Sequence, residues 1–293
     1  PFVFSQLPFG LLPGMLSFSI FIMIQGIMDQ FNWHLGKLLL TYVANSTAIA
    51  VYTVGLQICF LFYSMSSAFY GVVVPQIYKL VQKGRKAEIT DLWIKVGRYQ
   101  FYILFFIWAA FLIFGKSFVY LWAGHGYDDA YWVAIILMTP IVIHLCQVLA
   151  MEILRAYNKH PQWVLVHLLF SIAGFVICIP FSQRYGAVGV AIGTGINAFL
   201  VCNIYDNWYY YKAGNLDVFK FFRNFSGFLP ASVLIMIFGG ILSYNFEVLF
   251  WHEFFVLISV FTIVYIIVMY FLGMNIKEKE QIRALVSKIK IAF

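Results

Sequence analysis

The sequence predicts an all-α membrane protein, because it is too apolar and too weakly charged for a soluble fold. Of its 293 residues, 63% are hydrophobic and only 11% are charged, whereas a soluble domain is about 45–50% apolar and about 25% charged. Its mean hydropathy is +0.87. This composition excludes a soluble enzyme, a secreted disulfide scaffold and a disordered chain, since each needs more polar surface or more cysteine.

A transmembrane helix needs about 20 mainly apolar residues, and about eight runs of the sequence meet this requirement. The first is the least regular, since polar residues begin at Asp29. Pro140 predicts a kink in the fourth, and Gly189 and Gly193 give the sixth a small-residue face suited to close helix packing. We expect the spans at residues 12–35, 47–75, 98–122, 131–153, 163–182, 188–210, 228–246 and 253–273.

The spans divide into two units. The first six form a predicted lobe, residues 1–211, and residues 212–293 hold two further spans and a basic tail. Between the second and third spans, residues 78–97 predict a short, charged amphipathic helix. The tail 275–293 has apolar residues at helical spacing between lysines, which predicts a helix on the inner membrane surface, with a solvated tail as the alternative.

The basic residues predict how the chain is oriented. An even number of spans puts both ends on one side, and that side then holds all of the 19 Lys and Arg residues except Lys37, Lys116 and Arg184. Basic loops stay in the cytoplasm, so both ends are predicted to be cytoplasmic. The net charge of +7 therefore reflects topology and does not indicate nucleic-acid binding. The chain starts at Pro1 without a basic segment, so we expect no signal peptide and a longer parent protein.

The first span carries a polar stripe. Gln25, Asp29, Asn32 and Gly36 lie at i, i+4, i+7 and i+11, with Lys37 one residue further on, which is one face of a helix. Polar groups at membrane depth are costly, so this stripe predicts a wall of an aqueous cavity. The alternative is that the span ends near Gln25 and that an external loop begins at Asp29.

Two other spans contribute candidate residues. Gln57 belongs to a polar face of the second span, where simple interhelical hydrogen bonding is the alternative. In the fourth span His144, Gln147, Glu152 and Arg155 follow helical spacing, and the last two can pair. This pattern predicts a mouth for an anionic headgroup or, alternatively, an ion pair that anchors the helix. His144 could titrate near neutral pH or simply be hydrogen-bonded.

No pattern indicates catalysis or a bound metal. Asn197, Asn203 and Asp206 recur in the sixth span, and we assign them no site. The sequence has no nucleophile elbow, no zinc-protease motif, no phosphate-binding loop and no Cys/His spacing typical of zinc. The four cysteines are isolated in apolar runs. We therefore expect a protein that is not an enzyme and carries neither metal nor cofactor.

Several segments resemble one known family. Five segments are similar, in their order along the chain, to the oligosaccharide flippases of bacterial polysaccharide biosynthesis. They are residues 29–37, residues 48–57, the turn 121–132, the connection Glu152–Lys159 and the segment Tyr185–Gly189. These flippases belong to the superfamily of multidrug, oligosaccharidyl-lipid and polysaccharide exporters. The chain departs from the family at Gly36, where relatives often carry Asp, and at Thr41, where Gly is common. Asp29 is a candidate substitute for the missing acid.

The resemblance implies a function and a larger architecture. Family members have up to 14 helices in two lobes, and this chain resembles the second lobe plus the last two helices, so a missing N-terminal lobe is an expected partner. The implied activity is the flipping of a polyprenyl-diphosphate-linked oligosaccharide across a bacterial cytoplasmic membrane by alternating access, with possible polysaccharide-assembly proteins as further partners. The alternatives are a polymerase or ligase, or a drug or ion exporter of the same superfamily. The predicted cavity residues are Gln25, Asp29, Asn32, Lys37, Gln57, His144, Gln147, Glu152 and Arg155.

Overall fold

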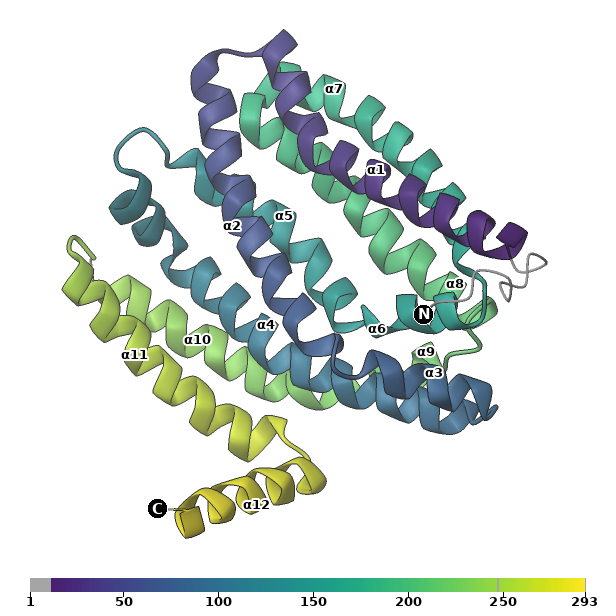
Figure 1. Ribbon diagram of the computed structural model, residues 1–293. Helices are drawn as coiled ribbons and strands as arrows, with labels where there is room; N and C mark the ends of the chain where they lie inside the picture. The colour runs from purple at the N-terminus through teal and green to yellow at the C-terminus, as the bar shows by residue number, and fades with distance from the viewer. Residues whose placement is uncertain (1–11, 247, 293) are drawn as a thin grey trace, which may run out of the picture.

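The computed structural model describes residues 12–246 and 248–292, and all regular structure in these two ranges is helical (Figure 1). The long helices are α1 (Leu12–Val43), α2 (Ser46–Tyr70), α4 (Lys86–Ala123), α5 (Asp129–Cys146), α7 (His160–Ala198), α10 (Leu229–Asn245), α11 (Trp251–Val268) and α12 (Ile276–Ala292). The shorter pieces are α3 (Val74–Gln82), α6 (Leu149–Ala156), η3 (Phe199–Tyr205), α8 (Asp206–Lys212), α9 (Val218–Phe225), η4 (Ser226–Phe228) and η5 (Met269–Gly273).

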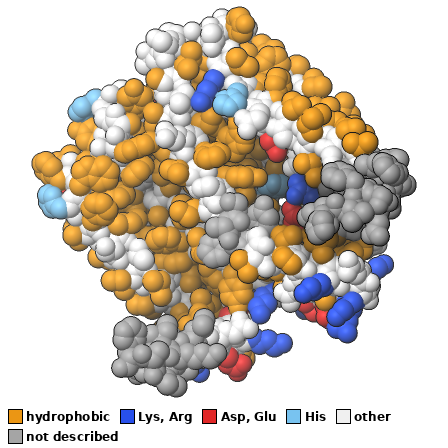
Figure 2. Space-filling model, in the orientation of Figure 1, with side chains coloured by type: hydrophobic (Ala, Val, Ile, Leu, Met, Phe, Trp, Pro, Cys, Tyr) orange, Lys and Arg blue, Asp and Glu red, His pale blue; other side chains and the backbone are white. Residues whose placement is uncertain are grey.

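The prediction of an all-α membrane protein is confirmed at this level. Within the described ranges, six helical segments are long and apolar enough to cross a membrane. The space-filling view shows a largely hydrophobic face, with acidic and basic side chains gathered towards its lower right (Figure 2). The six segments are Ser46–Ser66, Lys86–Ala123, Asp129–Cys146, His160–Lys212, Val218–Asn245 and Trp251–Gly273.

The two ends of the bundle differ in construction. The turns that follow α1, α4 and α10 lie at the upper left of Figure 1, together with the bend of α7. The short helices α3, α6 and α9 lie at the opposite end of the bundle, at the right of Figure 1. Lys37, Lys116 and Arg184 all belong to segments that approach the first end, so the basic residues separate along the bundle as the sequence predicts.

The longest helical path, His160–Lys212, is folded back on itself. Gly186 has φ +54° and interrupts the helical backbone of α7, a conformation that glycine adopts without steric cost. The small-residue face predicted in the sixth span makes the fold-back possible. A Cβ atom on Gly189 would overlap the carbonyl of Phe181, and one on Gly193 would lie 2.8 Å from Cys178 Sγ, so the two legs pack backbone against backbone.

Helix α1 is longer than predicted and decides between two interpretations of its sequence. It continues without a break to Val43, so the alternative in which a loop begins at Asp29 is wrong. The polar stripe is therefore a true helix face. Gly36 faces the buried ring of Tyr52 on α2, which a Cβ atom at this position would overlap. An acidic side chain at this position would have no room.

The fourth predicted span is divided, and the predicted amphipathic helix of residues 78–97 is split between two elements. Helix α5 ends at Cys146, and α6 begins at Leu149, so Gln147 lies in the break and Glu152 and Arg155 lie on a separate helix. Residues 78–82 belong to α3, whereas 86–97 form the first turns of α4. The predicted tail helix is present as α12.

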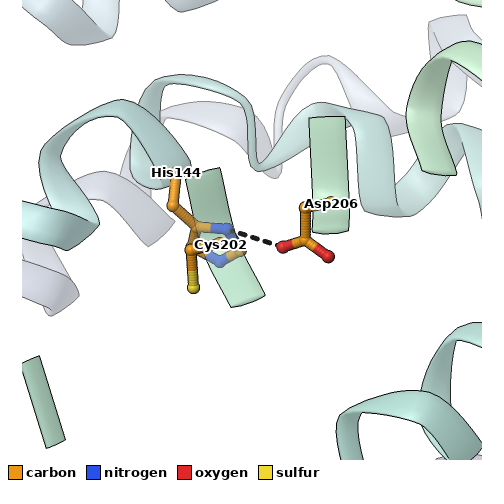
Figure 3. A group of neighbouring side chains, drawn as sticks. All are labelled: His144, Cys202 and Asp206. Carbon is orange, nitrogen blue, oxygen red and sulfur yellow. Dashed lines mark ion pairs between the residues drawn. The ribbon is translucent and has the colours of Figure 1, made fainter. Parts of the chain in front are cut away.

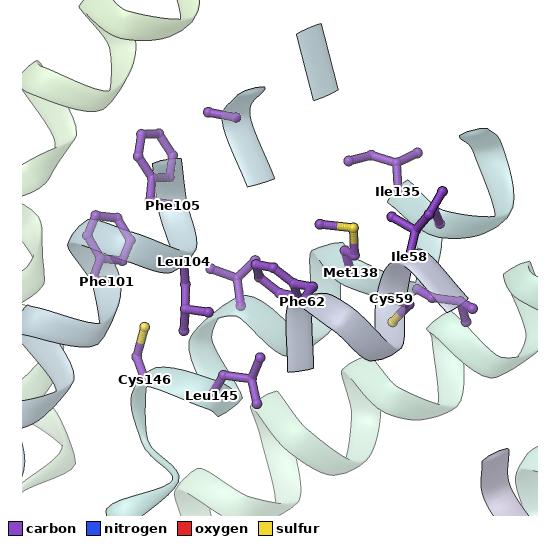
Figure 4. Close-up of a cluster of buried hydrophobic side chains, with 14 of the residues drawn as sticks. Ile58, Cys59, Phe62, Phe101, Leu104, Phe105, Ile135, Met138, Leu145 and Cys146 are labelled. Atoms are coloured by element: carbon purple, nitrogen blue, oxygen red, sulfur yellow. The ribbon is translucent and has the colours of Figure 1, made fainter. Parts of the chain in front are cut away.

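The core lies where α2, α4 and α5 meet (Figure 4). Phe62 from α2, Leu104 from α4 and Met138 from α5 are each almost fully buried. At the end with the short helices, α9 contributes Phe221, which stacks on Trp93 of α4 with ring centroids 4.4 Å apart. These contacts hold α4 and α5 as a scaffold against which α7 and α1 are placed.

A buried ion pair between Arg98 and Glu278 ties α12 to α4. Tyr102 donates its hydroxyl to Glu278 at 2.9 Å, and we call these three residues the clasp. Arg98 Nε and Nη2 donate to the two carboxylate oxygens of Glu278 at 2.7 and 2.8 Å. Arg98 Nη1 donates to the carbonyl of Asn224 at 2.6 Å. Glu278 also completes a capping box, since it accepts from the Asn275 amide and donates its own amide to Asn275 Oδ1. All three guanidinium nitrogens thus have partners.

Candidate functional site

A cavity of about 370 Å³ opens between α1, α2, α5, α6 and the two legs of α7. Its apolar wall includes Leu56, Leu137 and Phe175, and its polar wall includes Gln25, Asp29 and Asn32 of α1. Figure 2 shows a hollow on the right of that face, with His, basic and acidic side chains inside it. A polar cavity inside an apolar bundle is the typical place of a substrate path, because ionisable groups at membrane depth face water or protein.

One group of polar side chains lies where α1 meets α6 and the start of α7, and we call Gln25, Glu152, Arg155 and His160 the mouth cluster. Gln25 Oε1 accepts from Arg155 Nη2 at 3.0 Å and lies 2.7 Å from His160 Nε2. Arg155 Nη1 donates to Glu152 Oε1 at 2.5 Å. Arg155 Nε and His160 Nδ1 are buried without a hydrogen-bond partner. This cluster therefore keeps unused donor capacity beside the cavity.

A second group lies deeper, around Asp206, and we call His144, Trp163, His167, Cys202 and Asp206 the Asp206 cluster. Asp206 is fully buried. Its Oδ1 accepts from Trp163 Nε1 at 2.7 Å and lies 2.8 Å from His167 Nε2. Its Oδ2 lies 3.2 Å from His144 Nδ1 (Figure 3). The cluster joins α5 to both legs of the folded α7 path.

The residues predicted from the sequence separate into two sets. On the cavity wall lie Gln25, Asp29, Asn32, His144, Glu152 and Arg155. Away from the wall lie Lys37, which is partly buried, Gln57, which is exposed, and Gln147, which is fully buried. Gln147 donates to Asn207 at 2.8 Å, so its role is to join the break after α5 to α8. These three side chains are not among those that line this cavity, since each lies on a different helix face or in a break.

Sequence reasoning missed four residues that the structure brings to the site, namely His160, Trp163, His167 and Cys202. The first three occur at i, i+3 and i+7, which is one helix face, so this signal was available. Asp206 stands out in the sequence as a polar residue in an apolar run, but its partners come from other helices. Cys202 has no local signal, because its neighbours in sequence are not its neighbours in space.

The mixture of donors at the Asp206 cluster is of a kind that binds metal ions. His144 Nδ1, Cys202 Sγ and a carboxylate oxygen of Asp206 all lie within 4.8 Å of one another. Imidazole, thiolate and carboxylate are the ligands that Zn²⁺ takes in proteins. The mouth cluster, in contrast, offers a guanidinium group and suits an anion.

The chain matches no protein-family model, no curated protein and no solved structure. The resemblance to oligosaccharide flippases therefore stays a prediction that rests on the segments quoted for it. The site has to be interpreted from its own geometry.

Proposed function

We propose that the protein is a transporter that flips a polyprenyl-diphosphate-linked oligosaccharide across a bacterial cytoplasmic membrane. The observation that carries the proposal is the cavity of about 370 Å³, in which a guanidinium, amides and carboxylates meet inside an apolar bundle. Moving sugars and a diphosphate through hydrocarbon requires such a polar path. No soluble domain is present in the described ranges that would suggest a polymerase or ligase.

The mouth cluster supplies the chemistry for the headgroup. Arg155 Nη1 and Nη2 donate to Glu152 and Gln25, so a phosphate oxygen would bind the guanidinium by displacing one of these partners, and Arg is well suited to planar recognition of phosphate. Asp29 and Asn32 are exposed on the cavity side of α1 and can hydrogen-bond sugar hydroxyls. The cavity falls within the roughly 300–1,000 Å³ of small-ligand sites, so it receives the diphosphate and the adjoining sugar.

The proposed topology has eight spans with both ends in the cytoplasm. The segment His160–Lys212 contains 53 residues and bends at Gly186, so it supplies two antiparallel spans. Helix α1 has 32 residues, which at about 1.5 Å per residue exceeds the roughly 30 Å hydrocarbon core, and it supplies another. A second lobe, in the resemblance the N-terminal one, would close the cavity and allow alternating access.

The test is the pool of lipid-linked sugars in cells that lack the full-length gene. We expect complete repeat units to accumulate on the polyprenyl carrier, measured by mass spectrometry, because they are built but not moved. Wild-type protein should empty this pool, and Arg155→Gln should leave most of it. Arg85→Gln is the matched control, since Arg85 pairs with Glu88 on the surface at 3.1 Å and does not line the cavity.

Two results would contradict the proposal. Incomplete units on the carrier would indicate an enzyme of assembly. An unchanged pool with increased drug sensitivity would indicate an exporter of the same superfamily. Full rescue by Arg155→Gln would leave the transport proposal intact but remove Arg155 from it.

A further inference from the structure

Three side chains of the Asp206 cluster converge as metal ligands do, although they come from separate elements. His144 lies near the end of α5, Cys202 in η3 and Asp206 at the start of α8 (Figure 3). Their ligand atoms lie within 4.8 Å of one another. His144 and Cys202 line the cavity, so an ion has a route to the site from water.

The hydrogen bonds around Asp206 orient one of its oxygens and leave the other unused. Oδ1 is occupied by Trp163 Nε1 and His167 Nε2. Oδ2 is buried and meets no hydrogen-bond donor, and its only close polar contact is an ion pair with His144 Nδ1 at 3.2 Å. Carboxylates that bind metal are held in this way, with outer hydrogen bonds fixing the ligand.

The distance between these two atoms suits a shared ion. With zinc bonds of about 2.0–2.2 Å to N and O, two tetrahedral ligands lie about 3.3–3.6 Å apart. A cation placed between Oδ2 and Nδ1 would therefore need only a small widening of the ion pair that these two buried atoms form with each other at 3.2 Å.

The backbone holds the third ligand in place. Cys202 lies in the π-helix η3, and such wide turns are frequent at functional sites. Asn203, the next residue, donates to the carbonyl of Pro140 at 2.8 Å. This bond fixes η3 against α5 and keeps Cys202 near His144.

We propose that His144, Cys202 and Asp206 bind a zinc-like divalent cation, with a fourth position open to the cavity. Nitrogen, sulfur and oxygen donors together favour Zn²⁺ or Co²⁺ over Mg²⁺ or Ca²⁺, which take oxygen ligands. Binding converts the Cys202 thiol to a thiolate and releases its proton to water in the cavity. The site does not depend on the identity of the transported substrate.

The test uses the purified chain in detergent micelles with Co²⁺ as the probe. We expect a thiolate-to-cobalt charge-transfer band and visible bands of tetrahedral cobalt, and Zn²⁺ should displace both because it binds more tightly. Cys202→Ser should abolish the charge-transfer band. Asp206→Asn should weaken cobalt binding at least about tenfold, the loss seen even for residues that only position a ligand.

The matched control is Cys178→Ser, since Cys178 is buried and lines the same cavity, but its sulfur lies beside Thr194 and the Val190 carbonyl. This variant should keep the band. Thermal unfolding without metal checks that each variant is folded, and Zn²⁺ should raise the unfolding temperature of wild type and Cys178→Ser only. Absence of the band in wild type, or its persistence in folded Cys202→Ser, would overturn the proposal.

Discussion

The clasp and the Asp206 cluster are both buried groups of charged and polar side chains, yet they are satisfied to different degrees. In the clasp, Arg98 and Glu278 are about 7% and 6% exposed and bind each other through two hydrogen bonds. In the Asp206 cluster, the fully buried carboxylate leaves Oδ2 without a hydrogen bond. The mouth cluster likewise leaves Arg155 Nε free of partners.

This difference separates structural from functional polar groups. A fully satisfied buried pair fixes how two elements meet, here α4 and α12. Buried polar atoms without partners destabilise the fold, and they persist where a ligand can satisfy them. Both unsatisfied clusters lie beside the cavity of about 370 Å³, whereas Arg98 and Glu278 of the clasp line a separate pocket of about 350 Å³. Replacing an acid by its amide in each region tests this distinction.

The largest effect is expected for Glu278→Gln. The new amide nitrogen would face the donors of Arg98, and the guanidinium would remain buried without its counter-ion, which costs about 3–5 kcal/mol. Unfolding in detergent micelles, followed by circular dichroism, measures the loss. Asp91→Asn is the control, because the Lys220–Asp91 pair is about half exposed and should change stability by about 1 kcal/mol or less. Equal losses in the two variants would contradict the special role of the clasp.

A smaller loss of stability, also caused by weakening of the clasp, is expected at acidic pH. Burial disfavours the Glu278 carboxylate, but hydrogen bonds from Arg98 and the Asn275 amide outweigh it, so the pKa of Glu278 lies below its ordinary value of 4.5. Because the folded-state pKa is lowered, the clasp stabilises the protein fully well above pH 4.5. This contribution declines as the pH falls below that value and through the lowered pKa.

Unfolding temperatures measured at a series of pH values check the acid effect. The difference between wild type and Glu278→Gln should shrink as the pH falls through this window. A difference that stays constant down to strongly acidic pH would show that the lowered pKa of Glu278 does not contribute to stability.

The smallest effect on stability is expected for Asp206→Asn. Asparagine keeps an acceptor for Trp163 and His167, and its amide nitrogen can donate to His144 Nδ1 in place of the ion pair at 3.2 Å. We expect a change of about 1 kcal/mol or less in either direction, together with the loss of cobalt binding. A loss of stability as large as that of Glu278→Gln would show that Asp206 is structural after all.

The all-α class of the fold and several helix boundaries could be predicted from the sequence. Hydropathy located α10, and the path formed by α11 and η5, to within two residues, because these runs are uniformly apolar. The break at Gln147 and Val148 could not be predicted, since neither residue is a helix breaker and tertiary contacts decide the turn. The extension of α1 past Asp29 depended on whether the polar face had a cavity to line, which one helix cannot reveal.

The site was predictable only where it follows one helix. Gln25, Asp29 and Asn32 repeat at helical spacing, and the structure places all three on the cavity wall. The Asp206 cluster instead joins α5 to both legs of the α7 path. No spacing rule connects His144 to Cys202, and the π-turns of η3 that orient the cysteine have no sequence signature. Side chains that are distant in the sequence, such as His144 and Cys202, can be recognised as neighbours only in the three-dimensional structure.

The clasp also imposes an order on biosynthesis. Glu278 follows Arg98 by 180 residues in the chain, so a ribosome that adds about 5–20 residues per second needs roughly ten to forty seconds to make it after Arg98. During that interval Arg98 has been synthesised, but its carboxylate partner Glu278 has not. The contact between α4 and α12 is therefore a late event of assembly, and earlier helices must insert and pack without it.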